Sequence, residues 1–179
     1  MTTRTVIYVP DERLRRKAAT ITQFTPDLNQ LSIDMLETMR SCEGVGLAGP
    51  QIGVMDRIFV AEIPLPKEQV EPPPPHSGET YVLINPEILK FSTDLVEGQE
   101  GCLSIPGWAG LVERPEWVEV KALDVTGQPL KIKAVGLLAR IFMHEMDHLN
   151  GVLYTDHITD PEKLWPVSAD EAEEPAEVV

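Results

Sequence analysis

The chain has 179 residues, of which 42% are hydrophobic and 25% are charged, a composition that suits one globular domain with its own core. Its net charge of -14 argues against a nucleic-acid-binding protein, which needs a basic surface. No apolar run approaches the roughly 20 residues that span a bilayer, and residues 1–10 suit neither a secretory signal nor a transit peptide. The sequence therefore predicts a cytoplasmic protein without a membrane segment.

The N-terminal part of the sequence predicts one helical turn and one full helix. Residues 11–17 are polar and suit a short turn. Residues 27–40 carry apolar side chains at a 3.6-residue period, with Pro26 suited to the first turn and Gly44 ending the pattern. A glycine-rich loop is expected over residues 44–53.

The middle of the chain has the alternation and turn chemistry of antiparallel strands. Residues 126–128 indicate a hairpin turn between the last two strands. Residues 100–107 look like a loop, and residues 64–78 hold six prolines, which predicts an exposed and partly extended loop. The predicted strands cover residues 57–62, 81–85, 87–96, 116–124 and 130–135.

A second strong helix is predicted over residues 136–149, because apolar residues repeat there and Asn150-Gly151 ends the pattern. Residues 152–154 are expected to be a short strand or extended segment. Together these elements predict an α+β fold, in which short, mostly antiparallel strands surround a central C-terminal helix and another helix lies near the N-terminus.

The end of the chain differs in composition from the rest. From residue 160 onward it has seven acidic residues and one basic residue. Such a segment cannot bury enough apolar surface to fold alone. The sequence thus predicts a domain over residues 1–158 and an acidic, disordered tail over residues 159–179.

The pattern H-E-x-x-H at residues 144–148 is the most informative stretch. On a helix, residues four apart lie on one face, so His144 and His148 can bind one cation. Glu145 lies about 100° round the helix, where its carboxylate can hold a water molecule and move its proton. Polar residues inside an apolar helix are costly without partners, which argues against chance. The motif predicts metal-assisted hydrolysis.

A hydrolytic metal site needs a third protein ligand. Downstream, His157 follows the helix-ending Gly151, and Glu162 lies near the predicted tail, so neither suits the role. Upstream, Cys102 offers a soft thiolate, although a buried structural cysteine is an equal alternative on spacing alone. Cys42 falls at a helix end and is expected to be structural. A disulfide is disfavoured in a chain without a secretory signal.

The glycine-rich loop lacks both nucleotide-binding fingerprints. It predicts either a tight turn or a loop whose backbone approaches a substrate and presents Gln51. The Gln51 amide can donate a hydrogen bond to a developing oxyanion.

Three separated motifs make the sequence resemble the peptide deformylases. They are GVGLAGPQ at residues 44–51, EGCLS at residues 100–104 and HEMDH at residues 144–148, in the order and spacing of that family. The resemblance runs from about residue 6 to residue 154. Gly49 stands where the family usually has alanine, and this change removes no functional group.

The resemblance implies a metal centre. Cys102, His144 and His148 would bind one divalent ion, Fe²⁺ in the typical family member, with Zn²⁺, Ni²⁺ or Co²⁺ as substitutes. Glu145 would accept a proton from water and pass it to the leaving amine.

The resemblance also implies a substrate site. The oxyanion would be held by the metal, the Gln51 side chain and the backbone N–H of Leu103, while Gly46 would bond near the formyl group. The implied methionine pocket is lined by Val45, Leu137 and Ile141, whose apolar side chains suit it.

The implied substrate is the N-formyl-methionyl end of a newly synthesised polypeptide, which is cleaved to formate and a free amine. Transient ribosome association is an implied partnership, and nothing indicates an obligate interface, so a monomer is expected. Two alternatives remain: an H-E-x-x-H peptidase with a downstream third ligand, and a non-catalytic binder of formyl-methionine chains. Loss of Glu145 or Gln51 would indicate the second, and both are present.

Overall fold

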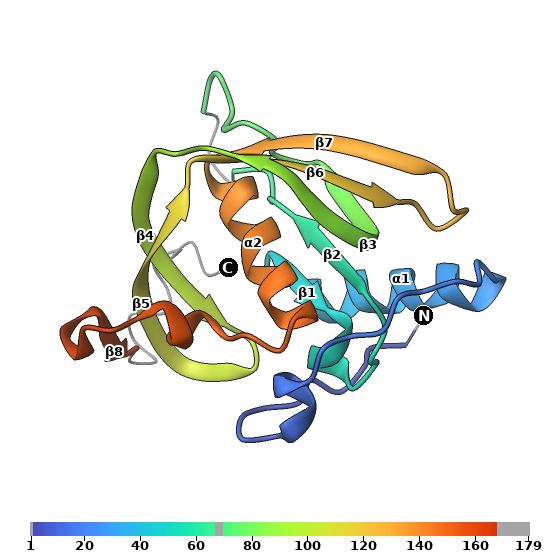
Figure 1. Ribbon diagram of the computed structural model, residues 1–179, viewed down its shortest axis with the longest axis horizontal. Coiled ribbons are helices and arrows are strands. Elements are labelled where there is room, and N and C mark those ends of the chain that lie inside the picture. The colour runs from blue at the N-terminus through green and yellow to red at the C-terminus, as the bar shows by residue number, and fades with distance from the viewer. Residues whose placement is uncertain (1, 67–69, 168–179) are drawn as a thin grey trace.

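The computed structural model describes residues 2–66 and 70–167. In this part of the chain, two antiparallel sheets surround a central helix, α2 (Leu137–Leu149), while α1 (Pro26–Ser41) lies outside the larger sheet (Figure 1). The strands are β1 (Gly46–Ala48), β2 (Ile58–Glu62), β3 (Thr80–Phe91), β4 (Leu95–Cys102), β5 (Ile105–Pro115), β6 (Trp117–Leu123), β7 (Pro129–Val135) and β8 (Leu164–Pro166).

The larger sheet has the strand order β1-β2-β3-β6-β7, and the smaller has the order β4-β5-β8. Every pairing between these strands is antiparallel. The predicted α+β fold is therefore confirmed, including its central helix and its N-terminal helix.

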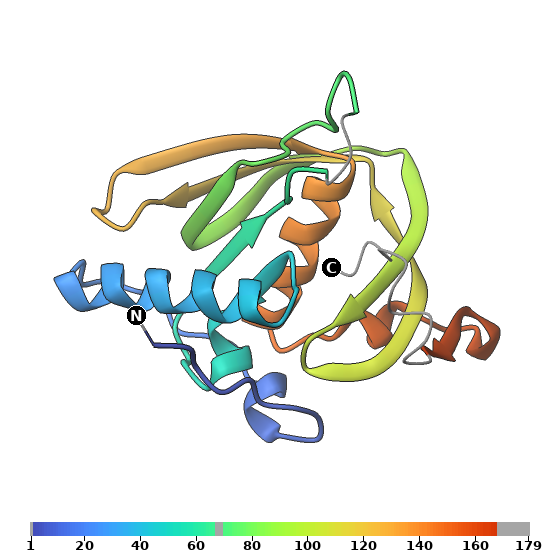
Figure 2. The same ribbon diagram turned by 180° about the vertical axis from the view of Figure 1, so that it is seen from behind.

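The larger sheet separates the two helices because its strands alternate side chains between two faces. On β2, Ile58 and Val60 belong to the buried cluster beneath α1, whereas Phe59 and Ala61 belong to the cluster that includes α2. Figure 2 shows α1 crossing one face of this sheet.

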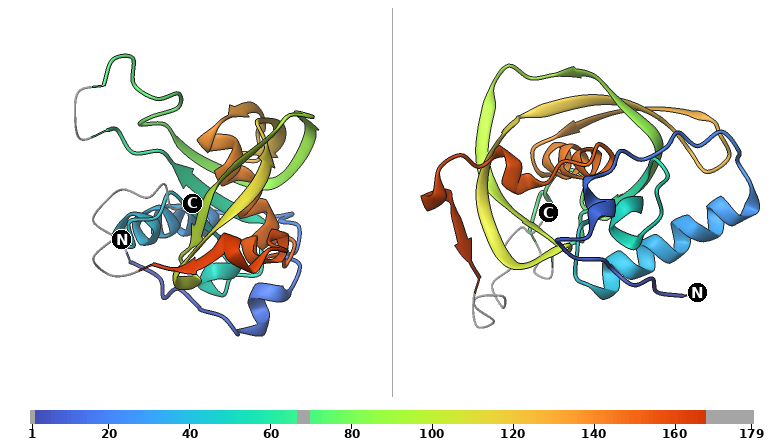
Figure 3. Two further views of the ribbon diagram at one scale, coloured as in Figure 1. Left: turned by 90° about the vertical axis from the view of Figure 1, so that its left-hand side faces the viewer. Right: turned by 60° about the horizontal axis from the view of Figure 1, so that its bottom comes forward.

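The smaller sheet covers another side of α2, as the end-on view in Figure 3 shows. A third buried cluster there joins Cys102 and Val112 to Tyr154. With both sheets around it, α2 is buried on nearly every side, and its polar residues Arg140, His144, Glu145 and His148 are buried along with the apolar ones. No helix among the described residues combines the length and hydropathy needed to cross a membrane.

Both N-terminal predictions are confirmed, since a 3₁₀ turn covers Glu12–Arg15 and α1 begins at Pro26. The glycine-rich segment is only partly a loop. It contains β1, which pairs with β2, and then a 3₁₀ turn over Gly49–Ile52 that carries Gln51. Residues 46–48 show no strand periodicity in the sequence, and they form a strand because they pair with β2.

Strands β3, β4 and β5 differ from the prediction. The segment 87–96, expected to be one strand, contains the turn between β3 and β4, and the loop expected over residues 100–107 contains the end of β4 and the start of β5. β3 continues through Pro86, where two strands were expected, because a register shift between Ile84 and Glu87 accommodates a residue that lacks a backbone N–H. β5 crosses a glycine-rich segment that gives little strand signal, and its pairing with β4 overrides that weak propensity. The described parts of the proline-rich loop, residues 64–66 and 70–78, are largely exposed as predicted, and residues 67–69 lie outside the described residues.

The segment after α2 differs from the prediction. Residues 152–153 form no strand, although Leu153 has the extended backbone that the prediction allowed. A 3₁₀ turn then covers Tyr154–His157, and the Asp156 carboxylate accepts a hydrogen bond from the Leu153 N–H at 2.9 Å. The start of the predicted tail is ordered, whereas disorder was expected there. Pro161–Lys163 form a 3₁₀ turn and β8 pairs with β5. Residues 168–179 lie outside the described residues.

Candidate active site and metal centre

Cys102, His144 and His148 meet at the centre of the fold. Cys102 is the last residue of β4, and the two histidines lie one turn apart on α2. Their candidate ligand atoms lie within 4.8 Å of one another, and Cys102 Sγ is 3.2 Å from His148 Nε2. The three residues are only 4%, 2% and 1% exposed. One sulfur and two imidazole nitrogens form a donor set that suits Zn²⁺ or Fe²⁺.

The ionisation of these donors also fits a cation. Burial lowers the pKa of His148 well below its usual value, so the imidazole is neutral and can ligate. Burial raises the pKa of the Cys102 thiol to about 12, and a divalent cation would shift the thiol towards the thiolate. The sulfur already accepts hydrogen bonds from Gln51 Nε2 at 3.5 Å and from the Ser104 N–H at 3.4 Å.

Glu100 orients His144 from behind the ligand set. Its Oε2 lies 2.9 Å from His144 Nδ1, which leaves Nε2 of that ring for a cation. Burial alone would raise the pKa of Glu100, but hydrogen bonds from Arg114 and His144 outweigh it and hold the pKa below its usual range. Arg114 binds both carboxylate oxygens, at 2.8 and 3.0 Å. The charged carboxylate is therefore fully paired.

Arg140 also donates to Glu100 Oε1, at 2.9 Å. Glu100, Arg114 and Arg140 were not among the site residues predicted from the sequence. Glu100 opens the EGCLS motif, and Arg140 lies four residues before His144, so its side chain shares a helix face with that ligand. That spacing was the available signal. The partnership of these residues forms when β4 pairs with β5 and packs against α2, which local patterns do not reveal.

Glu145 is the buried carboxylate beside the ligands. Only 1% of the residue is exposed, and its Oε2 has no hydrogen-bond partner among the described residues. Burial, followed by the negative charges of Glu100 and Asp147, raises its pKa well above the usual value. Burying such a group without a partner costs free energy, which is characteristic of a functional site. A cation held by the neighbouring ligands would offset this cost.

Gly46 allows the backbone of β1 to approach that carboxylate. A Cβ at residue 46 would lie 2.2 Å from Glu145 Oε1. The sequence could suggest only that the glycine-rich loop approaches a substrate. The structure adds that the absent side chain also makes room for the catalytic candidate itself.

We therefore expect Gly46→Ala to destabilise the protein by about 1–3 kcal/mol, the usual cost of overpacking, and to lower activity because Glu145 is displaced. Chemical denaturation and a formate assay measure the two effects. In a Glu145→Ala background the same change should cost much less stability, since the clashing carboxylate is gone. An equal cost in both backgrounds would contradict the contact.

Gln51 is held with a defined amide orientation. Its Oε1 accepts the Ala48 N–H at 2.7 Å, so Nε2 is the end that faces Cys102. Leu103 lies in the turn between β4 and β5, next to Cys102, and its side chain closely approaches Gly44. The two predicted oxyanion donors therefore come from different segments, the 3₁₀ turn after β1 and the turn after β4.

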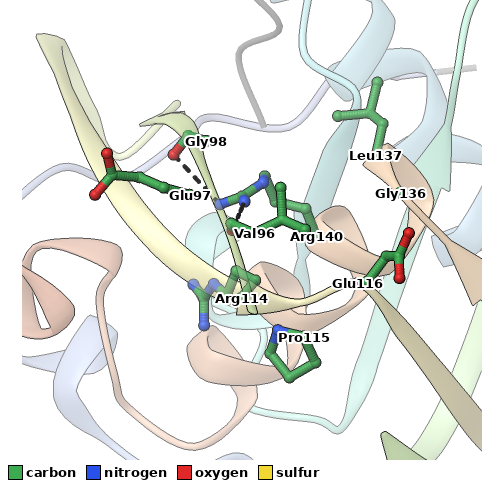
Figure 4. A pocket seen from close by; sticks show the side chains of 9 residues that line it. All are labelled: Val96, Glu97, Gly98, Arg114, Pro115, Glu116, Gly136, Leu137 and Arg140. Carbon is green, nitrogen blue, oxygen red and sulfur yellow. Dashed lines mark hydrogen bonds between the residues drawn. The ribbon is translucent and has the colours of Figure 1, made fainter. Parts of the chain in front are cut away.

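The three residues of the predicted methionine pocket belong to one apolar cluster. Ile141 is fully buried in it, while Val45 and Leu137 are partly exposed and pack against it. A separate cavity of about 280 Å³ lies at the N-terminus of α2, lined by Leu137 together with residues of β4 and β5 (Figure 4). Val45 and Ile141 do not line this cavity, so it is not the predicted methionine pocket, although Leu137 belongs to both.

The remaining candidates lie elsewhere. His157 Nε2 lies 2.7 Å from Asp147 Oδ2, and the candidate ligand group formed by the described residues does not include it. A downstream third ligand, as an H-E-x-x-H peptidase would need, is therefore not found in this part of the chain. Both cysteines are free, and Cys42 is exposed at the end of α1, so it is not the buried structural cysteine expected there.

Comparisons with known proteins agree with this geometry. The family model described as polypeptide deformylase matches residues 3–164. A peptide deformylase of Thermomicrobium roseum is 48% identical over 177 residues, which cover 99% of this chain and 97% of that protein. One from Symbiobacterium thermophilum is 49% identical over 174 residues, covering 97% of this chain and 74% of its own length.

Solved structures give the same result. The Legionella pneumophila peptide deformylase matches with a TM-score of 0.78 and 42% identity, over 90% of this chain and 89% of the other. The Synechococcus elongatus enzyme, solved in complex with actinonin, matches with a TM-score of 0.80 and 40% identity, over 91% and 84%. These similarities extend over nearly all of the described residues. The chain belongs to the peptide deformylase family and is a metal-dependent hydrolase that removes the N-formyl group from nascent polypeptides, releasing formate.

Proposed function

We propose that Cys102, His144 and His148 hold one divalent cation in this enzyme, and that Fe²⁺ is the native ion, with Zn²⁺, Ni²⁺ or Co²⁺ as working substitutes. The observation that carries the proposal is the convergence of one buried sulfur and two buried imidazoles beside Glu145, whose Oε2 has no hydrogen-bond partner among the described residues. The family's metal dependence supports it. Fe²⁺ and Zn²⁺ both accept this donor set, so supply in the cell decides between them.

Glu145 is the proposed general base and acid. A bound cation supplies Lewis acidity, which polarises the formyl carbonyl and makes a water molecule more acidic. Glu145 takes a proton from that water as its oxygen adds to the formyl carbon, and then gives it to the amine nitrogen as the C–N bond breaks. The products are formate and a free N-terminal amine.

Gln51 and Leu103 are the proposed oxyanion donors. The Gln51 amide is oriented by its bond from the Ala48 N–H, so Nε2 can donate without reorganising. The backbone N–H of Leu103, the residue that follows Cys102, is the second proposed donor. Gly46 is proposed to bond near the formyl group through its backbone, a role supported by its close approach to Glu145.

The methionine side chain is proposed to lie against Val45, Leu137 and Ile141. Their membership of one apolar cluster supports this, because a thioether gains free energy when it leaves water for such a surface.

The first test is formate release from a formyl-Met-Ala-Ser peptide, with protein purified without oxygen and assayed for metal. We expect turnover with about one cation bound by the three ligands. A chelator should abolish turnover, and Fe²⁺ should restore more of it than Zn²⁺. Metal-loaded protein that binds the peptide without releasing formate would overturn the mechanism. Metal content unrelated to activity would overturn the ion assignment.

We also propose a cellular setting, a monomer in the cytoplasm, as the sequence predicted. It would meet nascent chains during the transient ribosome association that the resemblance implied. We also propose that residues 1–158 form the catalytic domain and that residues 159–179 form a tail, although β8 joins the start of that tail to the domain by pairing with β5.

A further inference from the structure

Arg140 is a buried arginine whose guanidinium contacts Glu100, the carboxylate that orients His144. It lies on α2, one turn before His144, and is 8% exposed. Its Nη1 donates to Glu100 Oε1 at 2.9 Å, to the Val112 carbonyl at 2.8 Å and to the Gly98 carbonyl at 3.3 Å. Its Nη2 donates to the Val96 carbonyl at 2.7 Å. Figure 4 shows the guanidinium lying against Val96 and Gly98 of β4.

These bonds connect the two parts of the fold that supply the candidate ligands. Cys102 belongs to β4 in the smaller sheet, whereas His144 and His148 belong to α2. The distance from sulfur to imidazole therefore depends on how the sheet sits against the helix. Arg140 joins α2 to β4 and β5 at four acceptors, and one of these, Glu100, also binds His144.

Gly98 provides the space for this contact. A Cβ at residue 98 would lie 2.8 Å from both Cζ and Nη2 of Arg140. The planar guanidinium can therefore lie against the strand only where a side chain is absent. A glycine in the strand and an arginine in the helix form a matched pair.

Arg114 does not duplicate this role. It lies on β5, in the same sheet as Glu100, and it reaches α2 through Asp147, whose side chain is 20% exposed. Arg140 instead starts on the helix and bonds only buried or partly buried acceptors on the sheet. A charged guanidinium with fixed planar geometry, bonded at several acceptors, holds them more rigidly than a single pair would.

We propose that Arg140 is a positioning residue for the metal centre, which sets the relative placement of Cys102 and His144 by clamping β4 to α2 and by bonding Glu100. The proposal rests on the ligand set proposed above. It predicts that loss of the clamp weakens cation binding, beyond any general loss of stability.

The test is a competition titration of Co²⁺ and Zn²⁺ against a chromophoric chelator, with the full-length protein stripped of metal. Arg140→Met keeps a side chain of similar length without its donors, and we expect it to weaken binding about 10- to 100-fold, the usual effect of losing an outer partner of a metal ligand. The visible absorption of bound Co²⁺ should change as the donor geometry loosens. Arg140→Lys keeps the charge, and its cation affinity should fall between those of the unchanged protein and Arg140→Met.

Arg57→Met is the matched control. Arg57 is also a partly buried arginine. It bonds the main-chain oxygens of Leu149 at the end of α2 and of Pro86 in β3, as well as the Asn150 side chain, but it bonds no partner of a candidate ligand. Its loss should lower thermal stability and leave cation affinity unchanged. Equal affinity losses for Arg57→Met and Arg140→Met would reduce Arg140 to a structural residue and overturn the proposal.

A double-mutant cycle with Gly98→Ala covers the case in which Arg140→Met does not fold. Gly98→Ala displaces the guanidinium and should weaken cation binding by itself. In an Arg140→Lys background, where the planar guanidinium is gone, Gly98→Ala should cause little further loss of cation affinity. Additive effects on affinity would contradict the matched pair.

Cys102→Ser in the same titration separates this inference from the proposed ligand set. If Cys102→Ser weakens binding and Arg140→Met does not, only the clamp is wrong. If Cys102→Ser has no effect, the ligand set itself is wrong.

Discussion

Glu145→Gln is expected to lose about 10²- to 10⁴-fold of the rate of formate release, the range that general acid–base catalysis supplies, while the protein keeps its metal. Glutamine is nearly isosteric with glutamate, so it fits the space beside Gly46, but its amide cannot take up a proton. Single-turnover measurement of formate, together with metal analysis of the same sample, checks both parts of this result.

The matched control is Glu87→Gln, which makes the same chemical change at a strand position where the side chain pairs with Lys121 at the surface. It should leave turnover and metal content unchanged. A Glu145→Gln enzyme with near-normal turnover would refute the general-base assignment. Loss of metal from that variant would mean that Glu145 contributes to binding the cation.

Cys102→Ser is expected to lose most Fe²⁺ affinity and, with it, most Fe²⁺-dependent activity. The change replaces a soft thiolate with an alcohol, which is a poorer donor for this ion. The loss should exceed the roughly 10- to 100-fold effect of removing an outer partner of a ligand, because a direct ligand is removed. Anaerobic titration with Fe²⁺, followed by a formate assay at saturating metal, separates affinity from turnover.

Cys42→Ser is the control for Cys102→Ser. Cys42 is exposed at the end of α1, so the change should leave iron binding and activity intact. Near-normal iron affinity in Cys102→Ser would refute the ligand assignment.

Residues that act through local spacing were accessible from the sequence. The four-residue spacing of His144 and His148 places both imidazoles on one helix face in any α-helix, and the apolar pattern around them predicted that helix. Pro26 and the 3.6-residue period predicted α1 in the same way. These features depend on neighbours within one or two turns, so periodicity is sufficient to find them.

Residues that act through strand pairing were not accessible. Spacing left Cys102 undecided between a ligand and a buried structural cysteine, and only the meeting of β4 with α2 brings its sulfur to His148. Glu100 and His144 are 44 residues apart, and no local pattern links them. β8 was missed because the strand that it pairs with among the described residues is β5, far earlier in the chain.

The sequence by itself determined the chemical groups of this protein's site: a histidine pair on a helix, an adjacent carboxylate, a cysteine in a turn-like segment and a glycine-rich segment that can approach a substrate. The tertiary structure decided the geometry. The smaller sheet packs against α2 and so places Cys102 and Glu100 beside it, and Gly46 and Gly98 leave space for the side chains of Glu145 and Arg140. The physical reason is that residue type and spacing act along the chain, whereas burial and close contact arise only when distant segments pack together.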